Sequence, residues 1–217
     1  MWKKTLFLSI ALFGYIPPGS CDEPSNNQER PMTEKEKEAE ARRLFDEASA
    51  ALNERNFIQA CGQLEGALEL LPNHLNIAIK LGDCYERAGA VAAAYDRYIY
   101  AKKLAETQKN TKWLNFITAA ISRVYPRLSW LTVVVPEIVG TINGIVIMRD
   151  GTSIERVDWG MRIPIDRGGH EIWATAPGRK QWRASITIEG ESKAYSITVE
   201  NLAIASPPDP QNKPSQK

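Results

Sequence analysis

A pattern of small and large apolar residues occurs twice in this chain, at a spacing of 34 residues. Ala60 and Ala67 of the first copy correspond to Ala94 and Ala101 of the second. Small side chains at these positions let neighbouring helices approach closely, while larger residues such as Leu64 fill the space between them. One copy is the length of a helical hairpin, which cannot bury its apolar face alone. The repeat therefore predicts stacked helical hairpins.

Five helices are predicted in the first part of the chain. Thr33 and Glu36 form a capping box, so a first helix is expected to start there and to end near Arg55-Asn56. The remaining helices are predicted at residues 57–71, 75–88, 91–107 and from Asn110 or Thr111 to Tyr125. Two hairpins are fewer than the roughly three that a stack usually needs, so the fifth helix is expected to complete the core.

After about Leu128 the apolar residues recur with a period of two, which is typical of strands that are buried on one face. Asp150-Gly151 is a strong hairpin signal. Strands are predicted at residues 131–135, 144–148, 161–165, 170–176, 182–188 and 195–199. This order predicts an α+β multidomain fold, in which all-α hairpins precede an antiparallel β-sandwich.

The two parts resemble known families. The helical part is similar to tetratricopeptide repeats, through the 34-residue period and the positions Leu81, Gly82 and Tyr85. The later part resembles a PEGA-type domain, although Pro136-Glu137-Ile138-Val139 keeps only the first two letters of the signature. The other matching segments are Asp150-Gly151, Pro164, Gly168-Gly169-His170 and Ala176-Pro177-Gly178.

The whole layout resembles exported bacterial proteins that are common in myxobacteria. Stacked helical repeats hold partners and do no chemistry of their own, so we expect a non-catalytic protein-interaction or scaffold protein of the cell envelope. The expected organisation is a signal peptide at residues 1–20, a flexible tether at 21–32, a tetratricopeptide-like domain at 33–126, a PEGA-like β-sandwich at 128–202 and a disordered tail at 203–217.

The N-terminal segment is predicted to direct export. Lys3-Lys4 and the apolar residues 5–16 form a signal-like segment that is shorter than a spanning helix. Cys21 resembles the lipidated residue of a bacterial lipoprotein, which would place the chain at a membrane, but Pro18 departs from that pattern. An ordinary secretory signal cut near Ser20 is the alternative, and it leaves a periplasmic protein without a lipid.

Two further cysteines, Cys61 and Cys84, are predicted on helices that neighbour each other. In an oxidising compartment they could form a disulfide. The alternative is two buried free thiols, which behave as small hydrophobic residues.

The composition and motifs exclude several classes of function. The net charge is +1, from 27 basic and 26 acidic residues, and no basic stripe with aromatic residues suggests nucleic acid as a partner. His74 and His170 have no neighbours at metal-ligand spacing, so no metal is expected. No nucleophile, P-loop or dinucleotide motif occurs, so no enzyme activity and no cofactor are expected.

Two surfaces remain as candidates for binding. The first is the concave face of the hairpins, which would hold a protein or peptide partner, or would simply be solvated. Its predicted residues are Arg42, Phe45, Ser49, Asn53, Asn76, Ile79, Asp83, Glu86 and Arg87. The second is a sheet face with Trp173 and Arg183, where an exposed indole could stack on a cell-wall glycan. A Trp173 buried under a neighbouring segment is the alternative.

Overall fold

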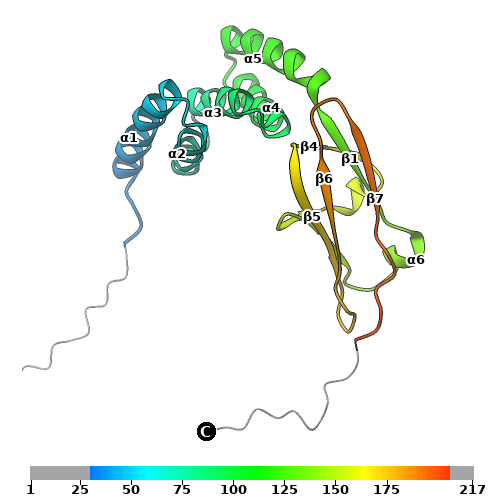
Figure 1. Ribbon diagram of the computed structural model, residues 1–217. Coiled ribbons are helices and arrows are strands. Elements are labelled where there is room, and N and C mark those ends of the chain that lie inside the picture. Colours follow the sequence, from blue (N-terminus) through cyan, green and yellow to red (C-terminus); the bar gives the residue numbers. More distant parts are fainter. Residues whose placement is uncertain (1–29, 206–217) are drawn as a thin grey trace, which may run out of the picture. The chain divides into compact units, whose positions relative to one another are not determined.

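The computed structural model describes residues 30–205, in which five long helices precede two β-sheets (Figure 1). The predicted α+β fold class is therefore correct. The predictions for the signal peptide, for Cys21 and for most of the tether and tail lie outside the described residues. The helices and the strands belong to one compact unit that begins at Thr33.

The helices begin and end close to where the sequence predicts. Thr33 and Glu36 form the expected capping box, and Gly89 ends the third helix in the left-handed conformation, at φ 78°. Asn110 caps the fifth helix through its side chain. The bounds are α1 Glu34–Asn53, α2 Phe57–Leu70, α3 Leu75–Ala88, α4 Val91–Thr107 and α5 Thr111–Val124.

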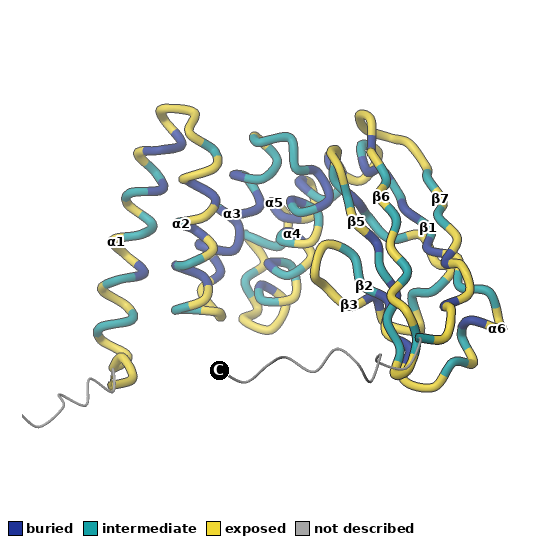
Figure 2. Tube along the Cα trace, turned by 60° about the horizontal axis from the view of Figure 1, so that its bottom comes forward, coloured by how far each residue is buried: buried dark blue, intermediate teal, exposed yellow. Residues whose placement is uncertain are grey.

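Each helix packs on the next one in the chain, so that α1–α2 and α3–α4 form two stacked hairpins. The four alanines of the 34-residue pattern, Ala60, Ala67, Ala94 and Ala101, are all fully buried. Buried residues occur in each of these helices (Figure 2). These small residues let the helices approach closely, and larger buried residues between them, such as Leu64 and Tyr98, supply most of the apolar contact.

The strands form two sheets, with orders β4-β1-β7 and β3-β2-β5-β6. Among the strands and α-helices, the short strand β3 and the helix α6 (Glu137–Gly140) were not predicted. The pairing of β1 with β7 is parallel, which corrects the expectation of purely antiparallel strands. The bounds are β1 Ser129–Val134, β2 Val146–Arg149, β3 Thr152–Ile154, β4 Arg162–Ile165, β5 Gly168–Thr175, β6 Trp182–Ile188 and β7 Ala194–Thr198.

Asp150 and Gly151 connect β2 to β3 in a two-residue turn, at φ 49° and 85°. Positive φ at both positions is the type I′ geometry, whose twist matches that of the flanking strands. The hairpin that Asp150-Gly151 predicts is therefore present, although its second strand, β3, has only three residues.

The end of the described chain pairs with an earlier loop. The N–H of Ala205 donates to the carbonyl of Gly178, and the N–H of Lys180 donates to the carbonyl of Ala203. An isolated bridge joins Arg179 to Ile204. The prediction that a disordered tail starts at residue 203 is therefore wrong for residues 203–205, because their backbone groups have partners.

Candidate functional site

A groove of about 850 Å³ lies between the first turns of α1, the end of α2 and the start of α3. We call it the α1–α3 groove. Its polar and charged lining residues are Glu34, Lys37, Glu38, Arg42, Asp46, Asn73, His74 and Asn76. Its other lining residues are Ala41, Phe45, Leu70, Leu71, Pro72 and Ile77.

Apolar side chains form part of this groove. Phe45 is half-buried on α1, and Leu70 and Leu71 are half-buried at the end of α2, each packing against the helical core. Ile77 is buried on the first turn of α3. The groove thus offers an apolar surface that is only partly covered by the chain itself, which is the kind of surface that accepts a side chain from a partner.

Charged side chains of both signs stand beside this apolar surface. Glu38, Arg42 and Asp46 follow one another at four-residue steps on α1, so they lie on one side of the helix. All three are exposed, and within residues 30–205 none has an ion-pair partner. Glu34 and Lys37 differ, since they pair with each other at 2.8 Å. The unpaired charges are therefore available to a ligand.

Three of the predicted partner-binding residues, Arg42, Phe45 and Asn76, line this groove. The remaining α1 residues do not. Asn53 is exposed at the far end of α1, and the Ser49 hydroxyl donates to the carbonyl of Phe45 at 2.9 Å, within its own helix.

Two predicted surface residues are parts of the packed interior. Ile79 is only 7% exposed and belongs to the helical core. The Glu86 side chain is 12% exposed and accepts hydrogen bonds from Tyr98, Arg123 and Arg127. The hydrogen bond from Arg123 is the largest cause of the lowered pKa of Glu86. Local periodicity could not exclude Glu86, because its partners Tyr98, Arg123 and Arg127 all lie outside its own helix.

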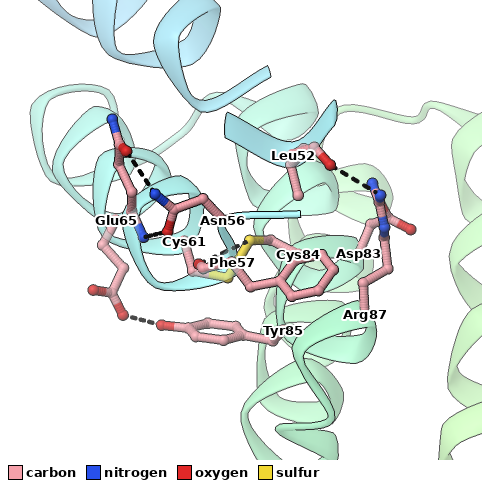
Figure 3. Close-up of a disulfide and its surroundings, with 10 residues drawn as sticks. Leu52, Asn56, Phe57, Cys61, Glu65, Asp83, Cys84, Tyr85 and Arg87 are labelled. Atoms are coloured by element: carbon pink, nitrogen blue, oxygen red, sulfur yellow. Dashed lines mark hydrogen bonds and ion pairs between the residues drawn. A yellow bond between two sulfur atoms is a disulfide. The ribbon is translucent and has the colours of Figure 1, made fainter. Parts of the chain in front are cut away.

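Arg87 on α3 contacts the end of α1 and the start of α2 (Figure 3). Its guanidinium donates to the carbonyl of Leu52 at 3.2 Å and lies 5.5 Å from the centre of the Phe57 ring. Asp83 is its other neighbour, with 3.9 Å between the charged groups. Arg87 and Asp83 therefore hold the end of α1 against α3, and neither lines the α1–α3 groove.

A disulfide joins Cys61 on α2 to Cys84 on α3, with 5.6 Å between the Cα atoms (Figure 3). It links the first hairpin to the second. Cys84 is fully buried and Cys61 is 6% exposed. A second groove of about 550 Å³ lies beside it, and Ile58, which is 92% exposed, lies at that groove.

Trp173 is half-buried on the outer face of the four-stranded sheet, while its neighbours Ile172 and Ala174 are fully buried on the inner face. The guanidinium of Arg183 lies 5.4 Å from the centre of the indole and pairs with Glu171 at 3.3 Å. One face of the indole is thus already covered by a side chain of the same sheet. Neither of the two grooves described above includes Trp173.

The contact between α4 and the sheet region is not apparent from the sequence. Asp166 accepts hydrogen bonds from the backbone N–H groups of Ala92 and Ala93 at the start of α4. His170 lies behind it, with Nε2 at 2.9 Å from the carbonyl oxygen of Asp166 and Nδ1 at 2.6 Å from the carboxylate of Asp150. Nothing in the sequence around Asp166 indicates that it caps a helix, because that helix lies far away along the chain.

In residues 30–205, no three side chains of histidine, cysteine, aspartate or glutamate are grouped so as to hold a metal ion. Over the same range, no helix combines the length and the apolar character needed to cross a membrane.

Comparison with known proteins gives limited similarity. No protein-family model and no curated protein matches the chain. A solution NMR structure of a tetratricopeptide repeat domain protein from Salinibacter ruber is similar to 39% of this chain and 85% of its own length, at 23% identity and a TM-score of 0.37. In the present chain, the 34-residue period, the stacked hairpins and the buried alanines together make the helical part tetratricopeptide-like.

Proposed function

We propose that this chain is a non-catalytic scaffold that holds a segment of a partner protein in the α1–α3 groove. The observation that carries the proposal is the combination in one groove of a partly covered apolar surface and three charges without an ion-pair partner among residues 30–205. Stacked helical hairpins commonly expose such a surface to a partner, because each hairpin contributes one helix to it.

The lining of the groove defines the kind of segment that fits. An apolar side chain placed against Phe45, Leu71 and Ile77 would leave water, which contributes about 1.5–3 kcal/mol for a residue of leucine size. Arg42 would attract an acidic group, and Glu38 and Asp46 would attract basic groups on either side of it. The expected ligand is therefore a short peptide segment that carries an apolar residue flanked by charges of both signs.

The proposed location is the bacterial envelope. The disulfide between Cys61 and Cys84 supports it, because disulfides persist in oxidising compartments and are rare in the cytosol. The signal-like N-terminus of the sequence is consistent with the same location. Under this proposal Cys21 would carry the lipid that tethers the scaffold to a membrane.

The test is selection of peptides from a random library on the purified chain, followed by fluorescence anisotropy with the selected peptides. We expect peptides of the stated composition, and at least a tenfold weaker affinity for Phe45→Ala and Arg42→Glu. Phe116→Ala is the matched control, because Phe116 is 49% exposed on α5 and lies outside the groove. Selected peptides that bind the groove variants and the control equally well would refute the groove as the binding site.

A further inference from the structure

The strand β6 forms one edge of the four-stranded sheet, and no strand in residues 30–205 pairs with its outer side. Its seven residues make it the longest edge strand in the described part of the chain. The other edge strands are shorter. β3 has three residues, β4 has four and contains Pro164, and β7 has five. An unpaired edge presents a row of N–H and C=O groups to which another strand can bind.

The neighbouring contacts show which peptide groups of β6 face outward. The carbonyl of Glu171 accepts from the N–H of Asp150, so Glu171 on β5 directs its peptide groups toward β2. Peptide groups alternate in direction along a strand, so His170 and Ile172 direct theirs toward β6. The registered partners of these two are Ile186 and Ala184.

The intervening residues of β6, Arg183, Ser185 and Thr187, therefore direct their N–H and C=O groups away from the sheet. Within residues 30–205, no hydrogen bond to these outward groups is found. The free edge stops at Glu189, whose peptide groups hydrogen-bond to the hydroxyl of Tyr195.

The side chains of β6 do not block this edge. Natural edge strands are protected by proline, by bulges or by charges that point inward. β6 has no proline, and its inward residues Trp182, Ala184, Ile186 and Ile188 are apolar. Its outward residues are exposed, and only Arg183 among them is charged.

We propose that two copies of this chain associate by antiparallel pairing of their β6 strands, with the two-fold axis at Ser185. In this register, Arg183 stands opposite Thr187 of the second copy, and Ser185 stands opposite its own counterpart. All six outward N–H and C=O groups of each strand then find partners. A shift that places Arg183 opposite Glu189 of the second copy leaves Arg183 without a partner, because the peptide groups of Glu189 already hydrogen-bond to Tyr195.

Charge complementarity favours a second copy as the occupant of this edge. Arg183 and Glu189 are six residues apart, so strand alternation continued one residue past the end of β6 at Ile188 would place them on the same face. Around a two-fold axis at Ser185, Glu189 of the second copy is the diagonal neighbour of Arg183, within reach of long side chains. Within the described residues, the carboxylate of Glu189 has no ion-pair partner. Symmetry provides this contact twice.

The first test is sedimentation equilibrium of the full chain in a mild detergent, with Ser185→Lys and Ser196→Lys. The first substitution places two like charges opposite each other at the axis. Ser196→Lys is the matched control, since Ser196 is an exposed serine on the edge strand β7 of the other sheet. We expect a dimer whose dissociation constant rises at least tenfold with Ser185→Lys and less than twofold with the control. A monomeric chain at about 100 µM, or equal effects of both variants, would overturn the proposal.

A second variant keeps the test independent of the stability of the lysine variant. Ser185→Cys is treated with a short bismaleimide, alongside Ser196→Cys and the unsubstituted chain. Paired residues at the axis lie about 5.5 Å apart, so a covalent dimer is expected with Ser185→Cys above the level of the unsubstituted chain. A covalent dimer that forms as readily with Ser196→Cys would contradict the proposed register.

Discussion

Asp166, in the turn between β4 and β5, supplies the N-terminal cap of α4, because its carboxylate accepts a hydrogen bond from the N–H of Ala92 at 2.7 Å. The local N-cap residue, Ala90, has no side chain that could do so. The negative charge also lies at the positive end of the helix dipole. A residue from the sheet region thus completes a helix of the second hairpin.

We therefore expect Asp166→Ala to lower the free energy of unfolding by about 1 kcal/mol, the usual cost of losing an N-cap. Asp166→Asn should cost less, because it keeps an acceptor oxygen without the charge. Denaturant unfolding gives these free energies, and amide hydrogen exchange at Ala92 and Ala93 gives the local effect. Unchanged exchange at both amides in Asp166→Ala would show that the cap contributes nothing.

Glu86 should make the stability depend on acid pH. Its folded pKa lies below the ordinary value of 4.5, chiefly through the hydrogen bond from Arg123. The stabilisation is therefore complete above about pH 4.5 and is lost as the pH falls through the folded pKa. Glu86→Gln should lower the free energy of unfolding by about 2 kcal/mol at pH 7, with a smaller difference from the unsubstituted chain at pH 3.

Unfolding of both chains across this pH range measures that effect. Glu38→Gln is the control, because Glu38 is exposed and, within residues 30–205, has no ion-pair partner. A loss for Glu86→Gln that stays constant down to pH 3 would show that the charge of Glu86 is not responsible.

The disulfide should stabilise the stacked hairpins. Cys61 and Cys84 are 23 residues apart, and closing a loop of this length in the unfolded chain corresponds to about 3 kcal/mol. Reduction with dithiothreitol should therefore lower the free energy of unfolding by about that amount. The double variant Cys61→Ala, Cys84→Ala should not respond to the reductant. Equal stability of the oxidised and reduced chains would contradict a structural role for the bond.

Two helical glycines should respond oppositely to alanine. A Cβ at Gly82 would lie 2.7 Å from Cε1 of Tyr98, a residue that is only 1% exposed. Gly82→Ala should thus destabilise by about 1–3 kcal/mol. At Gly62, on α2, a Cβ would meet nothing within 4 Å, so Gly62→Ala should stabilise by about 0.5–1 kcal/mol. Thermal unfolding of both variants tests whether close helix packing explains the small residues of the repeat.

Features with local signals were predicted well. The capping box at Thr33 and Glu36 and the helix end at Gly89 depend on residues within one or two turns, and both are observed. The alternation along β6 is observed for the same reason, since the strand period shows directly which residues are buried.

Features that depend on distant segments were missed or assigned wrongly. The parallel pairing of β1 with β7 joins residues more than 60 positions apart, and Asp166 caps a helix 74 positions earlier. Glu86 was placed on an open face because its spacing on α3 cannot show that Arg123 and Arg127 approach it. The groove was only partly predicted, since the end of α2 and the turn before α3 also form its wall.

The central claim is that the α1–α3 groove holds a partner protein. Its most direct test is photo-crosslinking in native cells with a benzophenone amino acid at position 45, compared with the same group at position 116 on α5. The account predicts one partner crosslinked from position 45, lost on adding Arg42→Glu, and absent from position 116. Crosslinks of equal yield from both positions, or a partner unaffected by Arg42→Glu, would contradict the account.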